Sequence, residues 1–389
     1  MPAFNSTNFV DFFNATRASK MTGIDYVFNA AAKHTYPMML LVRGQNPFSM
    51  VQGGSSIVEQ YNASDTQTFA KYNPGDPASI NLINTTKTLS ANWRFYRSHV
   101  GWTDAEFMLN TKGGAFVQVK RFRDLKEVQR QSEHLRGFDG LLFARPNSDT
   151  METAGPGAGG EAYSLPCFIT ENSNRWLPPS AVWSASTVVA QNPSTDTTWR
   201  NQRSTYNHLL PSDQSNGLLA AFDKILPDLQ FEAVPEASQA TEAAQSSDLI
   251  CFTSKDGIYL LTQEARAAQD RWVRPNDAGS FGSPTFDGIP IKRAQQMEEA
   301  LLEVDGYGSG AAYTGAAYTV GKPRYYFVSK THTHPVFADE GAGGVMRPED
   351  AIKLRETRPD TTVVWTQTTC NTITNARNRN GIICPVTPG

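Results

Sequence analysis

His332 and His334 are the only close pair of histidines in the sequence, and histidines can bind a metal ion or move a proton. On a strand, both would point to one side of a sheet, as metal ligands can. No third ligand lies nearby in the sequence, so the pair favours two loop or interface histidines over a metal site. For an enzyme with a dispersed active site, the candidate residues would be His332, His334, Asp339 and Glu340.

The short motifs of common catalytic and nucleotide-binding sites are missing from the sequence. It has no G-x-S-x-G, no H-E-x-x-H and no Walker loop. Gly306, Gly308 and Gly310 are closely spaced, but no helix is expected to open after them, as a phosphate site of this kind requires. His99 and His134 are expected to be satisfied polar groups. We therefore predict no catalytic residue, no metal and no cofactor.

The cysteines Cys167, Cys251, Cys370 and Cys384 are far apart and show no spacing typical of a metal site. We expect free, buried thiols in a reducing compartment. Cys370 and Cys384 bracket an Asn- and Arg-rich loop and could meet across a hairpin, so a disulfide between them is the open alternative.

A basic cluster, Lys120, Arg121 and Arg123, lies on a predicted helix. It has two interpretations, a solvated helix face or a face turned toward packaged nucleic acid, where binding would release counterions from the phosphates. The chain as a whole has a net charge of −3, so no global basicity points to nucleic acid or membrane.

The element that carries this cluster is the longest one in the sequence, a predicted helix over Ala115–Arg145. Apolar residues recur at helical spacing along it, and the positions between them are charged. At 1.5 Å per residue such a helix would be about 45 Å long, several times the average for globular proteins, so we interpret it as the spine of the fold.

The region before this helix has little to bury. Residues 1–47 hold aromatic clusters without a core of their own, which predicts an arm that packs on the body or on a neighbouring subunit. Residues 48–92 alternate as strands around a Pro74-Gly75 turn signal and predict a long two-stranded excursion. An isolated hairpin is marginal in water, so a partner chain is expected to order it.

The length of 389 residues suits two or three domains, and the second half of the chain predicts a small α/β layer. Between 91 and 109, Trp93 and Phe95 alternate with Arg94 and Tyr96, which indicates a strand against the long helix. Helices are predicted over Ser215–Leu229 and Thr253–Arg266, strands over Asp248–Phe252, Arg324–Val328 and Thr361–Thr369, and a turn followed by a strand over Phe286–Ile291; Ile382-Ile383 follow the Asn- and Arg-rich loop near the end.

Membrane and secretion signals are not found in the sequence. No apolar run approaches the roughly 20 residues that span a bilayer. The first residues, MPAFNSTNFV, have neither a basic nor an apolar region of the kind that begins a secretory signal, so synthesis in the cytoplasm is expected.

Six segments stand out when the chain is followed in order: VQGGSSIVEQ (Val51–Gln60), LSANWRF (Leu89–Phe95), NPSTDTTWRNQ (Asn192–Gln202), SDLICFTSKDGIYLL (Ser247–Leu261), FDGIPIKR (Phe286–Arg293) and WTQTTCNTITNARNRNGII (Trp365–Ile383). In this order they resemble segments of the major capsid proteins of tailed bacteriophages (Caudoviricetes), which have the HK97-like fold. The resemblance covers most of the chain and implies an α+β capsid fold.

The resemblance implies a division of the chain into an N-terminal arm, an extended β-hairpin loop, a peripheral domain with the long spine helix, and an axial α/β domain. The arm would be 1–47, the extended loop 48–92, the peripheral domain 93–150 with 325–389, and the axial domain 151–324.

The resemblance also implies a function: self-assembly as pentamers and hexamers into an icosahedral head around double-stranded DNA. Implied partners are a separate scaffolding protein, a portal and a decoration protein, with no membrane. Lys71 and Lys87 raise the option of an isopeptide cross-link. The residues expected to contact other subunits are Gly53, Gly54, Tyr61 and Tyr72 in the hairpin, and Arg377 and Arg379 in the closing turn.

Three alternatives stay open. An encapsulin-like shell would hold an enzyme in place of a genome. An enzyme with a dispersed active site would use the histidine region described above. A tail or adhesin protein would predict repeats or a trimeric coiled coil, and neither is found in the sequence.

Overall fold

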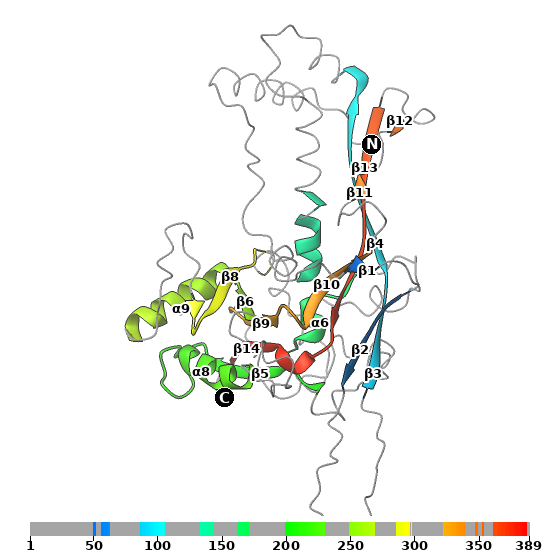
Figure 1. The fold of residues 1–389 in the computed structure, drawn as a ribbon. Coiled ribbons are helices and arrows are strands. Elements are labelled where there is room, and N and C mark those ends of the chain that lie inside the picture. The colour runs from blue at the N-terminus through cyan, green and yellow to red at the C-terminus, as the bar shows by residue number, and fades with distance from the viewer. Residues whose placement is uncertain are drawn as a thin grey trace, which may run out of the picture. The chain divides into compact units, whose positions relative to one another are not determined.

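The computed structural model describes fourteen stretches of the chain: 50–51, 56–62, 86–105, 133–134, 136–143, 162–170, 199–229, 249–268, 285–295, 297, 322–338, 347–348, 352–353 and 361–386. Figure 1 shows the described helices and strands as ribbons. Contacts divide the chain into two compact units. Unit 1 comprises Met1–His34, Phe95–Phe138 and Asp339–Thr369, and unit 2 comprises Thr35–Arg94, Asp139–Ala338 and Cys370–Gly389.

Unit 2 contains a mixed six-stranded sheet in the order β5-β14-β9-β6-β8-β7. β14 runs parallel to β5 and antiparallel to β9, while β6 runs antiparallel to β9 and parallel to β8. The sheet therefore joins segments from distant parts of the sequence. Its strands are β5 (Gln202–Asn207), β14 (Gly381–Val386), β9 (Tyr325–Ser329), β6 (Leu249–Thr253), β8 (Ile289–Arg293) and β7 (Thr285–Phe286).

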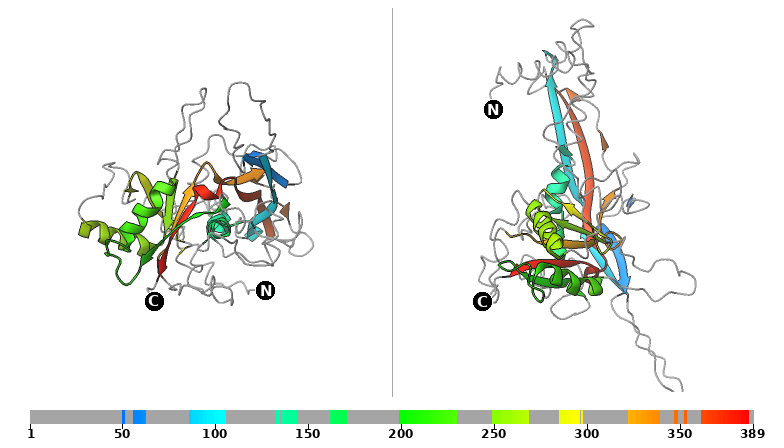
Figure 2. Two further views of the ribbon diagram at one scale, coloured as in Figure 1. Left: turned by 90° about the horizontal axis from the view of Figure 1, so that it is seen from below. Right: turned by 90° about the vertical axis from the view of Figure 1, so that its left-hand side faces the viewer.

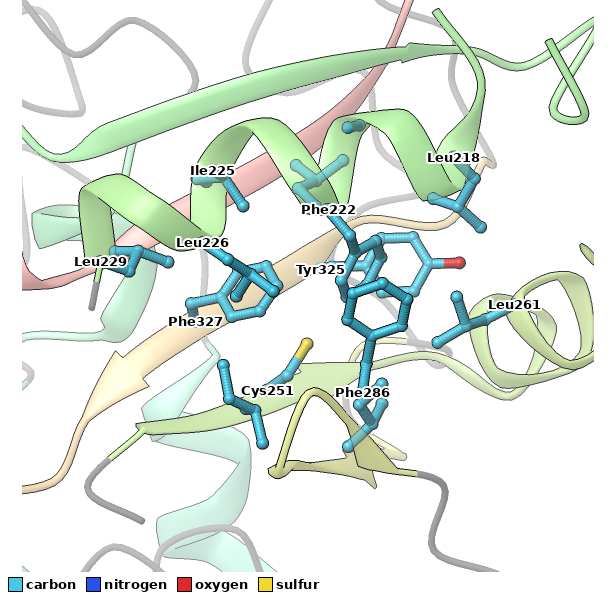
Figure 3. Close-up of a cluster of buried hydrophobic side chains, with 14 of the residues drawn as sticks. Leu218, Phe222, Ile225, Leu226, Leu229, Cys251, Leu261, Phe286, Tyr325 and Phe327 are labelled. Carbon is cyan, nitrogen blue, oxygen red and sulfur yellow. The ribbon is translucent and has the colours of Figure 1, made fainter. Parts of the chain in front are cut away.

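Two amphipathic helices pack on this sheet, α8 (Leu218–Leu229) and α9 (Lys255–Ala268). Figure 2 shows α8 alongside β5 and β14 from two further sides. The helical spacing of its apolar residues places them on one face, where Phe222 contacts Phe286, Tyr325 and Phe327 (Figure 3). These contacts form the centre of the hydrophobic core of unit 2.

Local signals explain where the elements of this layer begin and turn. The Ser254 side chain accepts a hydrogen bond from the Gly257 amide at 3.2 Å and so caps the start of α9. Asp287 and Gly288 both have positive φ, 50° and 80°, as a tight two-residue hairpin requires, and they join β7 to β8. The predicted helices and strands of this α/β layer are confirmed.

Unit 2 also contains the base of the predicted hairpin. β2 (Ser56–Asn62) pairs antiparallel with β3 (Thr86–Asn92), which confirms a two-stranded element there. The opposed residues Ile57 and Ala91 are both buried, so one face of the base is covered. The short α6 (Leu165–Phe168), also in unit 2, is buried at every residue.

A second sheet contains β10 (Thr333–Ala338) between the short strand β1 (Met50–Val51) and β13 (Thr361–Thr374). β13 belongs to both units, with Thr361–Thr369 in unit 1 and the rest in unit 2. In unit 2, β10 pairs with its final residues.

In unit 1, the first part of β13 pairs with β4 (Arg94–Thr103), β11 (Arg347–Pro348) and β12 (Ile352–Lys353). Residues 133–134 and 136–142 are helical. The Phe138 ring lies 5.5 Å from that of Tyr96, and the His134 Nε2 lies 2.9 Å from the Thr368 hydroxyl. The helix therefore packs against one face of β4 and β13, as predicted for its C-terminal part.

The rest of the predicted helix over 115–145, including Lys120, Arg121 and Arg123, lies outside the described residues, as does the arm 1–47. The compact units divide the chain near 138 and 369, whereas the predicted peripheral and axial domains divide it near 150 and 324. The predicted domains stay a prediction.

The strand predicted between 91 and 109 is confirmed as β4, but its alternation does not sort the side chains by polarity. Phe95 is 63% exposed, whereas Arg94 is 3% exposed. Alternation assigns residues to two faces but does not say which face is covered, and here the covered face of unit 1 carries Tyr96. The described residues contain no helix long and apolar enough to cross a membrane.

Candidate functional site

The closing turn between β13 and β14 is a single turn of 3-10 helix, Arg377–Arg379. The Arg377 side chain is fully buried. Its Nε donates to the Phe168 carbonyl oxygen at 2.5 Å, and one terminal nitrogen donates to the Thr170 hydroxyl at 2.6 Å and to the Asn201 Oδ1 at 2.9 Å. A single guanidinium therefore joins three distant segments of unit 2.

The Asn201 side-chain amide completes this network because both its oxygen and its nitrogen form hydrogen bonds. Its Oδ1 accepts from Arg377 and, at 3.3 Å, from the Thr170 amide, and its Nδ2 donates to the Thr170 carbonyl oxygen at 3.0 Å. A backbone hydrogen bond joins the same two segments, since the Gln202 amide donates to the Asn380 carbonyl oxygen at 2.9 Å where β5 meets β14. These bonds hold β5 in register with β14.

Asn380 plays the same part at the end of the turn. Its Oδ1 accepts from the Ser329 amide at 3.0 Å, and its Nδ2 donates to the Thr333 hydroxyl at 2.7 Å and to the Ala376 carbonyl oxygen at 3.2 Å. The asparagine is fully buried, so it needs all of these partners. It holds the link between β9 and β10 against the closing turn.

Burial lowers the pKa of Arg377 from 12.5 to about 9, which leaves the guanidinium protonated at neutral pH. Three neutral oxygens receive its charge-assisted hydrogen bonds. The network therefore acts as a structural tie within one chain, and the predicted contact of Arg377 with another subunit stays a prediction. Arg379 is half-buried, and its contact with another subunit stays a prediction.

The other predicted contact residues lie in or near the hairpin. Tyr61 pairs with Lys87 across β2 and β3, but its side chain, like Gly53, Gly54 and Tyr72, lies outside the described residues. Their contacts with other subunits stay predictions.

The histidine region does not form a paired strand site. His332 lies in the turn before β10, and its Nδ1 is 2.8 Å from the Asn375 Oδ1. His334 is buried in β10 opposite Ile373. Asp339 and Glu340 lie outside the described residues, among which no group of three possible metal ligands was found. The expectation of a loop histidine is confirmed for His332.

All four cysteines are free and buried, as expected, so Cys370 and Cys384 do not form a disulfide. Burial raises the pKa of Cys251 and of Cys370 above the usual thiol range. Protonated, buried thiols are poor nucleophiles, which gives them a packing role.

Sequence reasoning missed two kinds of residue. The buried asparagines Asn201 and Asn380 look like loop residues in sequence, and only their position in the resembling segments could have indicated a role. It also missed the exposed large apolar side chains of the described residues. These are Val58, Phe95, Leu209, Leu210 and Tyr259, each exposed by 57% to 63%.

Neither a protein-family model nor a curated protein matches the sequence. The fold of the chain, however, is similar to that of solved structures. A chain of the cyanophage A-1(L) capsid asymmetric unit is similar with a TM-score of 0.53 and 10% identity, covering 94% of this chain and 96% of that one. A chain from the capsid of an empty GTA particle has a TM-score of 0.50 and 9% identity, covering 94% and 100%.

This chain has the fold of phage capsid proteins. The capsid fold is mixed α+β, as predicted, and the similarity extends over nearly the full length of both chains compared. The holo-SrpI encapsulin complex from Synechococcus elongatus PCC 7942 is also similar, with a TM-score of 0.46, 11% identity and 94% coverage of each chain. The extended loop and the peripheral and axial domains of the capsid fold stay predictions for this chain.

Proposed function

We propose that this protein is the major capsid protein of a tailed phage, which self-assembles as pentamers and hexamers into an icosahedral head around double-stranded DNA. The observation that carries the proposal is the similarity to a cyanophage capsid chain over 94% of this chain and 96% of that one. Because the similarity extends over nearly all residues of both chains compared, the proposed role is structural.

The hairpin supports the proposal on physical grounds. At its base, Ile57 and Ala91 are buried, but Val58 on the opposite face is 57% exposed. A two-stranded element with one apolar residue turned to solvent gains stability when another chain covers it. We propose that residues 48–92 form an extended loop that contacts a neighbouring subunit, through Gly53, Gly54, Tyr61 and Tyr72.

A shell protein must also keep one rigid shape in many similar environments. The buried network around Arg377 and Asn380 supports that requirement, because it fixes the strands of unit 2 by hydrogen bonds that need no partner. The peripheral domain (93–150 with 325–389) and the axial domain (151–324) are proposed as the parts that meet other copies.

The proposed partners follow from the same role. They are further copies of the chain, a separate scaffolding protein, a portal, a decoration protein and the packaged DNA. Lys120, Arg121 and Arg123 are the residues proposed to face the genome, through non-specific phosphate contacts.

Electron microscopy of the purified protein tests this function. The protein is expressed with and without a candidate scaffolding protein from the same genome, and closed shells or rings of five and six are expected in at least one condition. A monodisperse monomer or small oligomer in both would contradict the proposal. Shells that enclose a protein and no DNA, when purified from infected cells, would favour an encapsulin-like container.

A further inference from the structure

An aromatic and basic surface lies on unit 1, on the side of β4 and β13 away from the helix at 133–142. The helix contacts the even-numbered side chains Tyr96 and Thr368. Successive strand residues point to opposite faces, so the odd-numbered residues of both strands share the other face. Figure 2 shows the two strands side by side.

Four side chains lie on this odd-numbered face, which we call the β4/β13 face: Phe95, Arg97, His99 and Trp365. The Arg97 guanidinium carbon lies 4.6 Å from the centre of the Trp365 ring, in cation–π geometry. The His99 ring lies 4.8 Å from the same ring, tilted by 43°. Arg97 and His99 are exposed, and Phe95 is 63% exposed.

The composition of this face is that of a protein interface. Aromatic residues and arginine are enriched where proteins bind each other, and lysine, aspartate and glutamate are depleted. The described odd-numbered residues of β4 and of Thr361–Thr369 include no lysine, aspartate or glutamate. Stacking on Trp365 also holds Arg97 in place, which lowers the entropy lost when a partner binds.

Nucleic acid fits this face less well than protein. Binding to a phosphate backbone draws its strength from several cations, each of which releases counterions. Arg97 is the only permanently charged residue among the described odd-numbered residues of β4 and of Thr361–Thr369, and Arg347, paired with Gln367, adds one arginine from the neighbouring strand β11. A stacking site for bases needs an open ring, and the Trp365 ring already has Arg97 and His99 against it.

We propose that the β4/β13 face is a docking surface for a second copy of this chain, with Phe95 as the apolar centre of the contact and the Arg97–Trp365 stack beside it. This inference rests on the proposed function, since it names one surface through which the subunits assemble. Charge complementarity supports a second copy as the occupant, because the face carries a positive charge and the whole chain has a net charge of −3.

The test uses two matched variants of the full-length protein. Phe95→Ser removes the proposed apolar centre, and Tyr259→Ser removes a side chain of equal exposure, 63%, from α9 in unit 2. Both are exposed, so both variants are expected to fold, which circular dichroism and urea unfolding check. We expect the yield of assembled particles, measured by sedimentation, to fall at least about tenfold for Phe95→Ser and less than about twofold for Tyr259→Ser.

A second measurement needs no variant. Wild-type subunits are exposed to hydroxyl radicals before and after assembly, and oxidation of Phe95 and Trp365 is followed by mass spectrometry. Both rates are expected to fall severalfold on assembly, because a second copy covers the rings.

The outcomes separate this inference from the proposed function. If the wild type forms no particles, the proposed function fails and the inference fails with it. If the wild type assembles while Phe95→Ser assembles equally well and the oxidation rates do not change, only the inference is overturned. If Arg97→Gln assembles normally but binds a random double-stranded DNA fragment severalfold less tightly than the wild type, the face would be assigned to nucleic acid. That result would also overturn the inference.

Discussion

Removal of the Arg377 guanidinium should lower the stability of unit 2. Arg377→Met keeps the length of the side chain but removes the hydrogen bonds to the Phe168, Thr170 and Asn201 oxygens. Hydrogen bonds from a charged group contribute about 1.5–3 kcal/mol each, so we expect the free energy of unfolding of the unassembled subunit to fall by at least about 3 kcal/mol. Urea unfolding measures this.

Arg379→Met is the matched control, two residues further along the same turn and half-buried. It should change the free energy of unfolding by less than about 1 kcal/mol. Equal losses for the two variants would mean that the turn responds to any lost arginine and that the network around Arg377 is not decisive.

Two glycines should respond to alanine in opposite directions. A Cβ at Gly217 would overlap the backbone carbonyl oxygens of Pro211 and Asp213, which cannot move without opening the loop before α8. Gly140, in the helix at 136–142, has nothing within 4 Å of an added Cβ. Gly217→Ala should therefore lower the melting temperature, whereas Gly140→Ala should raise stability by about 0.5–1 kcal/mol. Thermal unfolding compares the two, and a loss for Gly140→Ala would contradict this account.

The buried phenol of Tyr325 should make the free energy of unfolding depend on pH in the alkaline range. Burial, and to a lesser extent the neighbouring Tyr206, raise the pKa of its phenol well above the usual 10. Above pH 10 the unfolded chain loses this proton while the folded chain keeps it. The unfolded state then binds fewer protons, so the free energy of unfolding falls as pH rises, by at most about 1.4 kcal/mol per pH unit for this group.

Urea unfolding at intervals from pH 8 to 11 measures that slope. Tyr325→Phe should be less stable near pH 8, because it loses the hydrogen bond from Tyr325 to the Gly257 carbonyl oxygen. Above pH 10 its stability should fall less steeply than that of the wild type. Identical slopes would show that Tyr325 ionises equally easily in both states.

At the scale of elements, α8 should depend on one side chain. Phe222 is fully buried and contacts three aromatic rings from β7 and β9. Phe222→Ala should cost about 3–5 kcal/mol through lost burial and the cavity it leaves. Asp228→Ala, on the exposed side of the same helix, should stay within about 0.5 kcal/mol of the wild type. A comparable loss for Asp228→Ala would point to helix propensity as the cause.

The hairpin was predictable as an element because its signal is local. Alternating residues and turn signals predict paired strands, and β2 and β3 are paired as expected. The exposure of the β4 side chains was not predictable in the same way. Phe95 is exposed and Arg94 is buried because tertiary packing decides which face of a strand is covered.

At the scale of the whole molecule, the hairpin should separate folding from assembly. Replacing residues 63–85 with Asn-Gly closes β2 and β3 with a two-residue turn at the pair Asn62 and Thr86. The shortened subunit should fold, with urea unfolding close to the wild type, but should form no closed shells by electron microscopy. Normal shells from this variant would contradict a role of the hairpin in assembly, and loss of folding would show that it stabilises the monomer.

The amino-acid sequence by itself determined the elements whose signals lie within one segment. Helical spacing predicted α8 and α9, the Asp287-Gly288 pair predicted a turn, and the order of the resembling segments predicted an α+β capsid fold. Only the tertiary structure decided how Arg377 is used, because its partners Thr170 and Asn201 lie 207 and 176 residues away. No local pattern encodes a contact over that separation, so neither its burial nor the exposed β4/β13 face could be predicted before the strands were paired.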